Sequence, residues 1–267
     1  MHALVNIAVR AARRAGDAII RNINRLDSIR VSSKGRNDFV SEVDHLAEQE
    51  IIQTVRKSYP DHAFLAEESG KSGDSEFVWI IDPLDGTTNF LHGFPTFAVS
   101  VAVEHSGRIE HGVVYDPLRQ ELFTASRGAG AQLDGRRIRV SQARTLESCL
   151  VGTGFPFRGG SEDLDAYMPM LRAMIEATEG VRRPGAAALD LAYVAAGRLD
   201  GFWEMGLSPW DVAAGGLLIQ EAGGRVGDMN GGDDWLYSGH IVAGNLRIFD
   251  ALVATLGPHR PERLKGG

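Results

Sequence analysis

One stretch of this chain joins an apolar strand directly to closely spaced acidic, glycine and hydroxyl residues. It reads Trp79-Ile80-Ile81-Asp82-Pro83-Leu84-Asp85-Gly86-Thr87-Thr88-Asn89-Phe90. The strand runs straight into two carboxylates that stand three residues apart. Asp at the first position and Pro at the second favour a type I turn, which holds its end Cα atoms within about 7 Å. The sequence therefore predicts a buried strand that ends in a turn presenting Asp82 and Asp85.

The residue types in this turn suit both a metal ion and a phosphate group. Two carboxylates held close together can share a site for hard divalent cations. Gly86, Thr87 and Thr88 can present free backbone N–H groups at a helix start, where a phosphate binds well. The alternative is ordinary turn chemistry, with Asp85 capping a helix.

Three other segments carry residues suited to the same site. Glu67 and Glu68 follow a short strand, and only one of them is expected to face the site because neighbouring strand residues point to opposite faces. Asp211 is the first carboxylate before an apolar helix, and Gly185-Ala186-Ala187-Ala188 begins another helix with small residues that allow close approach to a ligand. The structural alternatives are an exposed acidic loop, a helix N-cap and a tightly packed helix start, respectively.

The hydrophobic pattern predicts helices and strands with no internal repeat and no obvious linker. A capping box at Ser41 to Asp44 begins one helix, residues 25–40 form a polar connector, and the residues after Gly257 are frayed. The expected helices cover residues 3–24, from near Ser41 to Tyr59, 161–178, 186–196, 212–222 and 246–256. The expected strands cover residues 63–66, 77–81, 97–103, 109–115, 121–125, 149–152, 200–204, 224–227 and 240–243. Residues 1–267 are expected to form a single domain, with an α+β half at 1–145 and an α/β half at 146–267.

Charge and composition exclude several classes of protein. The net charge of −7 over 267 residues argues against bulk nucleic-acid binding, although residues 1–37 carry a net +6 that is either a solvated face or a contact for an acidic partner. No apolar run approaches 18 residues and no secretory signal is apparent, so no membrane span is expected. The single cysteine, Cys149, favours a reducing, cytoplasmic setting. The scattered histidines disfavour zinc but leave oxygen-ligated magnesium open.

Taken together, these segments resemble the inositol monophosphatase family, and the resemblance covers nearly the whole chain. It is carried by Leu65-Ala66-Glu67-Glu68-Ser69, by residues 79–90, and by Pro209-Trp210-Asp211-Val212-Ala213-Ala214-Gly215 with Glu221-Ala222-Gly223-Gly224. The N-terminal Asn6-Ile7-Ala8-Val9-Arg10-Ala11-Ala12-Arg13 and the length are most similar to the bacterial SuhB branch. The resemblance implies an α+β fold, a layered α-β-α-β-α sandwich of the sugar-phosphatase type shared with fructose-1,6-bisphosphatase.

The resemblance also implies an activity, Mg2+-dependent hydrolysis of inositol 1-phosphate and other small phosphate monoesters, with lithium as an inhibitor. Two or three Mg2+ ions per site are implied. By motif position the first ion is held by Glu67, Asp82, the Leu84 carbonyl and Asp85, and the second by Asp82, Asp85 and Asp211. Glu67 would also hold a weaker third ion, near a mobile loop that carries Lys34 and Asp38.

The same resemblance assigns catalytic and substrate-binding roles. Glu67, Thr87 and Asp44 would be catalytic, with Asp44 and the Thr87 hydroxyl orienting the attacking water. The residues implied in substrate binding are Asp85, Gly86, Thr87, Gly185, Ala187, Glu204 and Asp211. One departure is Ala186, where relatives commonly have Ser or Thr, so a hydroxyl for the ring is absent.

The implied mechanism is physically coherent. A phosphate monoester dianion repels a hydroxide nucleophile, and two cations about 3.5–4 Å apart neutralise that charge and bind the entering and leaving oxygens. Four acidic side chains crowded together repel one another without cations, so the site is expected to be loose when empty and ordered by metal.

Several alternatives stay open. The same mechanism could act on fructose 1,6-bisphosphate, histidinol phosphate or other polyol phosphates. Phosphoadenosine phosphatases of the same superfamily usually have Lys-Glu where this chain has Thr88-Asn89, which favours the monophosphatase branch. A different class is a binding role in ribosomal RNA transcription, associated with RNA polymerase and antitermination, for which the basic N-terminal third and Arg182-Arg183 could provide contacts. A homodimer is expected because homodimers are common in the family.

Overall fold

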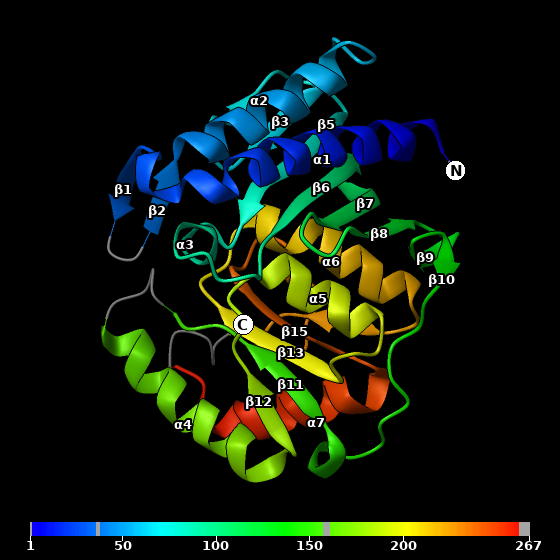
Figure 1. Ribbon diagram of the computed structural model, residues 1–267. Coiled ribbons are helices and arrows are strands. Elements are labelled where there is room, and N and C mark those ends of the chain that lie inside the picture. Colours follow the sequence, from blue (N-terminus) through cyan, green and yellow to red (C-terminus); the bar gives the residue numbers. More distant parts are fainter. Residues whose placement is uncertain (1, 36–37, 157–160, 262–267) are drawn as a thin grey trace.

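Helices and sheets alternate in five layers (Figure 1). This computed structural model describes residues 2–35, 38–156 and 161–261. Helices α1 (Ala3–Asn22) and α2 (Glu42–Arg56) cover one face of an eight-stranded sheet, and α5 (Ala187–Ala195) and α6 (Pro209–Glu221) lie between it and a five-stranded sheet. Helices α4 (Ser161–Ala177) and α7 (Leu246–Leu256) cover the outer face of the second sheet. The expected α-β-α-β-α sandwich is confirmed.

The larger sheet comes from the first half of the chain, and its strand order is β10-β9-β8-β7-β6-β5-β3-β4. Its strands are β3 (Ala63–Ala66), β4 (Gly70–Ser72), β5 (Phe77–Asp85), β6 (Ala98–His105), β7 (Arg108–Asp116), β8 (Glu121–Ser126), β9 (Gly130–Leu133) and β10 (Arg136–Arg137). Only β3 and β5 pair in parallel; the other neighbouring strands are antiparallel. Strand β5 therefore lies inside the sheet, paired on both edges.

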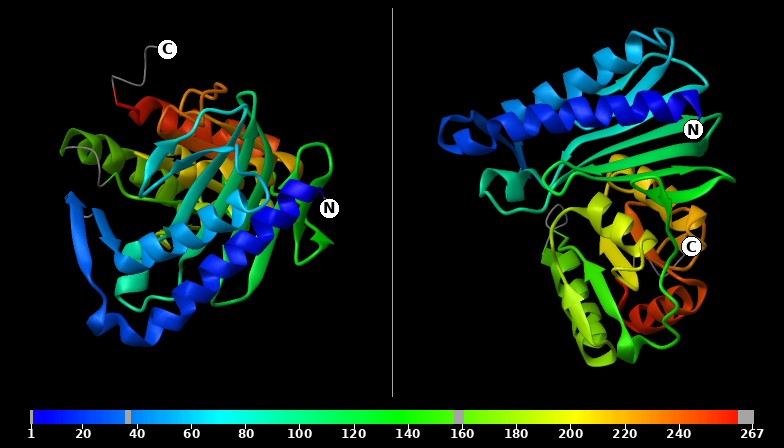
Figure 2. Two further views of the ribbon diagram at one scale, coloured as in Figure 1. Left: turned by 90° about the horizontal axis from the view of Figure 1, so that it is seen from above. Right: turned by 45° about the vertical axis from the view of Figure 1, so that its right-hand side comes forward.

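The smaller sheet follows in the second half, with the order β12-β11-β13-β15-β14. Its strands are β11 (Leu150–Thr153), β12 (Gly180–Arg182), β13 (Gly201–Met205), β14 (Arg225–Gly227) and β15 (His240–Gly244). Strand β11 pairs in parallel with β12 and β13, whereas β15 is antiparallel to β13 and β14. Figure 2 shows this half packed below the eight-stranded sheet, with α1 and α2 on the far side of that sheet.

The apolar residues of β5 alternate between two cores. Trp79 and Ile81 are buried with α1 and α2, whereas Ile80 is buried with α5 and α6. Side chains of a strand repeat with a period of two, so Asp82 shares the face of Ile80. This alternation directs Asp82 toward the middle helical layer, where Asp211 lies on α6.

Some local predictions were wrong. The predicted connector over residues 25–40 contains a short 3-10 helix, Ile23–Ser28, and a hairpin of β1 (Val31–Gly35) and β2 (Asp38–Ser41). The predicted fraying after Gly257 is also wrong at its start, because Gly257–His259 forms a 3-10 turn. Residues 262–267 lie outside the described part of the chain. Within that part, no helix combines the length and the apolar character needed to cross a membrane.

Candidate active site

The end of β5 is a bulged strand rather than the predicted type I turn. Asp82 pairs with Ser100 and Asp85 pairs with Ala98, so three steps along β5 match two along β6. Residues i and i+3 of a regular strand point to opposite faces, and one extra residue returns them to the same face. The Leu84 N–H donates to Asp82 Oδ1 at 3.0 Å, which stabilises the bulge. The bulge is the local reason that Asp82 and Asp85 act together.

Gly86 links this bulge to the five-residue helix α3 (Thr87–Leu91). Its φ of 91° is left-handed, a conformation that costs glycine little. A Cβ here would approach the Thr96 carbonyl oxygen to 3.0 Å, so a larger residue is disfavoured on two grounds. The first N–H groups of a helix have no intrahelical acceptor, and those of α3 stand next to the two carboxylates.

Thr87 connects the cavity to a buried carboxylate on α2. The Thr87 hydroxyl lies 2.7 Å from Asp44 Oδ1 and 3.0 Å from the Leu84 carbonyl oxygen, and it can donate to either. The other Asp44 oxygen accepts from the Ser41 N–H at 2.8 Å, which completes the predicted capping box. Burial raises the pKa of Asp44, and the bonds from Ser41 and Thr87 oppose that rise.

Asp211 approaches from the other half of the chain. It is the third residue of α6, and its Oδ2 accepts from the Ser208 N–H at 2.7 Å in a second capping box. Ser208, not Asp211, is therefore the N-cap. Oxygens of Asp82, Asp85 and Asp211 all lie within 4.8 Å of one another, and all three residues are buried. Side chains far apart in sequence thus form one compact group.

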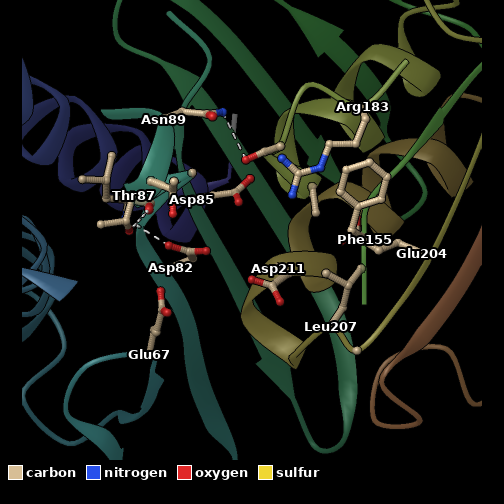
Figure 3. Close-up of a pocket in the computed structure, with 16 residues that line it drawn as sticks. Glu67, Asp82, Asp85, Thr87, Asn89, Phe155, Arg183, Glu204, Leu207 and Asp211 are labelled. Atoms are coloured by element: carbon tan, nitrogen blue, oxygen red, sulfur yellow. Dashed lines mark hydrogen bonds between the residues drawn. The ribbon is translucent and has the colours of Figure 1, made fainter. Parts of the chain in front are cut away.

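Glu67 borders the same cavity but stands outside that compact group of three (Figure 3). Its carboxylate points toward Asp82 from the turn between β3 and β4. Glu68 does not line the cavity, which agrees with the expectation that only one of the two would face it.

The opposite wall comes from the second half of the chain. It includes Gly185, Ala187 and Glu204, which were predicted to contact the substrate, and the cavity measures about 350 Å³. Thr88, which was predicted to present its N–H group to a phosphate, also lines the cavity. The structure adds lining residues that were not predicted for the site: Asn89, Phe155, Arg183, Gly206 and Leu207. Arg183 lies over the Phe155 ring at 4.8 Å, on the same side of the cavity as Glu204 (Figure 3). From the sequence, Arg183 was predicted only as a contact for a transcription partner, whereas its side chain forms part of this wall.

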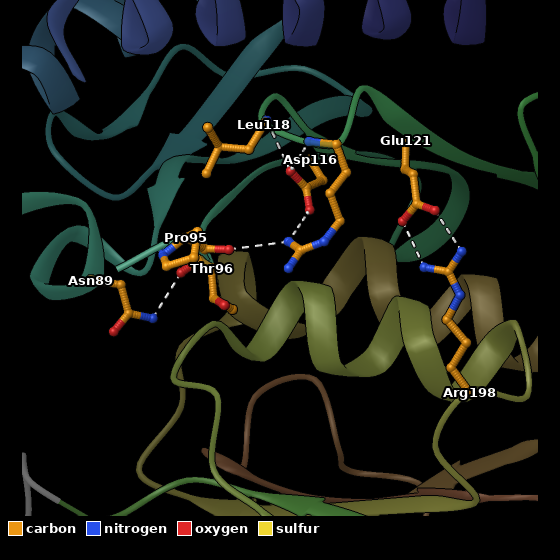
Figure 4. A network of polar contacts seen from close by, with 8 residues as sticks. Asn89, Pro95, Thr96, Asp116, Leu118, Glu121 and Arg198 are labelled. Carbon is orange, nitrogen blue, oxygen red and sulfur yellow. Dashed lines mark hydrogen bonds and ion pairs between the residues drawn. The ribbon is translucent and has the colours of Figure 1, made fainter. Parts of the chain in front are cut away.

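Asn89 fastens the two halves together beside the cavity. Its amide nitrogen donates to the Thr96 carbonyl at 2.7 Å and is 2.8 Å from the Pro184 carbonyl. The loop that carries Thr96 is held from its other side by Arg119, which donates to the Pro95 carbonyl at 3.1 Å and to Asp116 at 2.9 Å (Figure 4). These contacts fix the loop against which Gly86 packs.

Asp85 also caps a helix across the cavity. Its Oδ2 accepts from the Ala188 N–H in the first turn of α5 at 2.7 Å. Ala186 is the N-cap of α5 and has no side chain able to cap it. Ala186 is buried and is not among the described lining residues, so its methyl group does not line the cavity.

The electrostatics of the site fit a cation. Burial, and next the charge of Asp211, raise the pKa of Asp85 to about 8. Burial, and next Glu67, raise the pKa of Asp82 well above its usual value. Carboxylates that resist ionisation because they are buried and face one another are stabilised by a shared positive charge, and carboxylate oxygens are the ligands hard divalent cations prefer. The residues present therefore fit the expected metal.

All the predicted site residues except Asp44, Lys34 and Asp38 line this one cavity. The predicted residues found there are Glu67, Asp82, Leu84, Asp85, Gly86, Thr87, Gly185, Ala187, Glu204 and Asp211. Asp44 does not line the cavity but can accept a hydrogen bond from the Thr87 hydroxyl, which does. The Lys34 and Asp38 side chains lie outside the described part of the structure. Another buried carboxylate, Asp190, was not predicted: it is 1% exposed, and its Oδ1 has no hydrogen-bond partner among the described residues.

Comparison with known proteins gives a consistent result. The family model for the inositol monophosphatase family matches residues 1–259. A relative from Pseudomonas aeruginosa, named Nus factor SuhB, is 58% identical over 99% of this chain and 100% of its own length. The crystal structure of the extragenic suppressor protein suhB from Bartonella henselae superposes with a TM-score of 0.92 at 48% identity, covering 96% of this chain and 98% of that one. The inositol monophosphatase from Anabaena (Nostoc) superposes with a TM-score of 0.85 at 38% identity, covering 98% of both chains.

Proposed function

Because the chain belongs to the inositol monophosphatase family, we propose that it is a Mg2+-dependent phosphatase for inositol 1-phosphate and related small polyol phosphate monoesters. One observation carries the proposal. The buried carboxylates of Asp82, Asp85 and Asp211 have oxygens within 4.8 Å of one another, and they adjoin the first N–H groups of α3. A cation site next to an anion site suits a phosphate ester.

Acidic side chains would hold the ions, and backbone groups would hold the phosphate. The proposed metal ligands are Glu67, Asp82, the Leu84 carbonyl, Asp85 and Asp211, for two or three Mg2+ ions. When bound, these ions supply neutralisation of the phosphate charge and a lowered pKa for water. The N–H groups of Gly86 and Thr87 would donate to phosphate oxygens.

Thr87 and Asp44 would orient the attacking water. When the Thr87 hydroxyl donates to Asp44 Oδ1 at 2.7 Å, its lone pairs are left to accept a hydrogen bond from water in the cavity. Asp44 is fully buried and held by Ser41, so the position of this acceptor is fixed before substrate binds. Such preorganisation lowers the entropy lost in reaching the transition state.

The wall from the second half would recognise the polyol. Glu204 offers acceptor oxygens to ring hydroxyls, and Gly185 and Ala187 let the ring approach the backbone closely. The cavity of about 350 Å³ accepts a small ring with one phosphate. Fructose 1,6-bisphosphate and histidinol phosphate are the main competing substrates.

Phosphate release from a panel of monoesters tests the proposal. We expect hydrolysis of inositol 1-phosphate to require Mg2+, to stop with chelator and to be inhibited by lithium. Fructose 1,6-bisphosphate and histidinol phosphate belong in the same panel, and a preference for either would correct the substrate but keep the mechanism. Strong hydrolysis that chelator does not affect would refute the mechanism.

A second role in transcription is favoured by one comparison, the Nus factor name of the relative at 58% identity. Helix α1 exposes Arg10, Arg13 and Arg21, which suit an acidic partner. We expect Asp85→Asn to abolish hydrolysis but leave binding to a reconstituted RNA polymerase–Nus factor complex unchanged. Arg10→Glu with Arg21→Glu should do the converse. Arg183 is unsuitable for this test because it lines the cavity.

The proposal also includes a cytoplasmic homodimer. The one cysteine, Cys149, is free and buried, and a single cysteine cannot form an intrachain disulfide, which suits a reducing compartment. Light scattering after size-exclusion chromatography should give twice the mass of the 28.9 kDa chain.

A further inference from the structure

Helix α2 carries a second buried carboxylate, one turn after Asp44. Glu48 is 4% exposed, and its Oε2 accepts from the backbone N–H of Glu68 at 2.9 Å. Residues four apart share one face of a helix. The same face of α2 therefore contacts both Thr87 and the turn that carries Glu67 and Glu68.

This hydrogen bond acts on the backbone next to Glu67. The Glu67 N–H donates to the Ile81 carbonyl at 3.1 Å and so extends the pairing of β3 with β5. The following peptide group contains the Glu68 N–H, which Glu48 holds. With the peptide groups on both sides fixed, both backbone dihedrals of Glu67 are restrained, and so is the direction of its Cα–Cβ bond.

We propose that Glu48 is a positioning residue, whose carboxylate fixes the Glu67–Glu68 peptide and thereby aims the Glu67 carboxylate at the metal cavity. The inference rests on the proposed metal-dependent function. Glu67 needs such support more than the other acidic residues do, because it stands in a turn and outside the compact group of three. Asp82 is held within a strand and Asp211 within a helix.

The test compares three substitutions at position 48 with a control on the same helix. Glu48→Leu removes the acceptor, Glu48→Asp withdraws it by one methylene group, and Glu48→Gln keeps an acceptor oxygen without the charge. Glu50→Gln is the control, because Glu50 makes a surface ion pair with Arg14 at 2.7 Å. Mn2+ binding is measured by calorimetry, and the Mg2+ concentration for half-maximal hydrolysis is measured alongside.

We expect Glu48→Leu to weaken Mn2+ binding and raise the half-saturating Mg2+ by about tenfold, the usual effect of losing a hydrogen bond that orients a metal ligand. At saturating Mg2+, kcat should largely recover. Glu48→Gln should bind Mn2+ with an affinity within about threefold of wild type. If only the charge of Glu48 mattered, Glu48→Gln would instead bind Mn2+ as weakly as Glu48→Leu. An unfolding transition recorded in EDTA establishes that each variant is folded before denaturation.

A folded Glu48→Leu whose Mn2+ affinity matches Glu50→Gln would overturn the inference. If Glu48→Leu does not fold, Glu48→Asp decides in the same way. A Mn2+ affinity equal to that of wild type would overturn the inference, and a weaker Mn2+ affinity would support it. Failure of the proposed function looks different, because the wild-type protein itself would then show neither Mn2+ binding nor Mg2+-dependent hydrolysis.

Discussion

On the proposed function, Asp85 combines two tasks that place opposite demands on its charge. As the cap of α5 it needs only an acceptor oxygen for the Ala188 N–H, whereas a metal ligand needs the full negative charge. Its pKa of about 8, raised first by burial and then by Asp211, shows that the protein without metal resists that charge. Here local stability and the proposed catalysis are in conflict, as is common at functional sites.

Asp85→Asn separates the two tasks. Asn keeps an acceptor for Ala188 but cannot bind the cation as strongly, so hydrolysis should fall at least about a hundredfold. In EDTA at pH 8 the thermal midpoint should stay the same or rise, because repulsion from Asp211 is removed. Asp85→Ala also loses the cap and should unfold with about 1 kcal/mol less free energy than the Asn variant. Exposed Asp74 provides the control, Asp74→Asn, and an active Asp85→Asn would contradict the assignment.

Asp190 is a buried carboxylate with no described partner for Oδ1. Burial, and next Glu204, raise its pKa well above the usual value. Because the pKa of Asp190 is higher in the folded than in the unfolded chain, its contribution to stability is fully present below the unfolded-state pKa, near pH 4. That contribution is lost as pH rises through the folded-state pKa. We expect Asp190→Asn to unfold at the same denaturant concentration as wild type near pH 4 but to gain about 1–3 kcal/mol at pH 8. An equal difference at both pH values would exclude ionisation as the cause.

At the scale of single elements, α2 shows how strongly local signals can determine structure. The capping box over Ser41 and Asp44 was predicted from the sequence, and it starts the helix where expected. The β1–β2 hairpin was missed because residues 25–40 are polar and lack strand alternation. The bulge in β5 was missed because Asp-Pro also favours a turn, and only pairing with β6 distinguishes the two.

Ser41→Ala tests the cap separately from the chemistry. It removes the hydroxyl that accepts from the Val43 N–H at 3.2 Å, so the free energy of unfolding should fall by about 1 kcal/mol. Hydrolysis at a temperature where the variant is folded should largely persist, because Asp44 Oδ1 still accepts from Thr87. Exposed Ser148→Ala is the control for urea denaturation. A large loss of kcat without loss of stability would instead give Ser41 a direct catalytic role.

At the scale of the whole molecule, the site depends on contacts that no local pattern reveals. The suitability of residues 82–88 for a metal ion and a phosphate was predicted from their types and spacing alone. The meeting of Asp211 with Asp82 and Asp85 depended on the family resemblance, because it requires α6 to pack on β5 and β6. Arg183 and Phe155 were not predicted to line the cavity, since their loops reach it only through the layer arrangement.

Metal removal gives a prediction for the whole fold. The pKa values of Asp82 and Asp85 lie above those of an unfolded chain, so the metal-free protein binds extra protons and loses stability as pH rises from about 4 to about 8. Mg2+ must displace those protons at low pH. The rise in thermal midpoint on adding Mg2+ over EDTA should therefore be larger at pH 8 than at pH 6. An equal or larger rise at pH 6 would contradict this linkage.

The order in which the ribosome delivers the acidic groups has a consequence for synthesis. Asp82 and Asp85 emerge early, but Asp211 lies on α6, after β13. A nascent chain that stops before α6 carries the other described residues that line the cavity but lacks Asp211, and so it has two of the three clustered carboxylates. On the proposed chemistry, such a truncated polypeptide is inert toward phosphate esters, so catalytic competence begins only when translation of this chain is nearly complete.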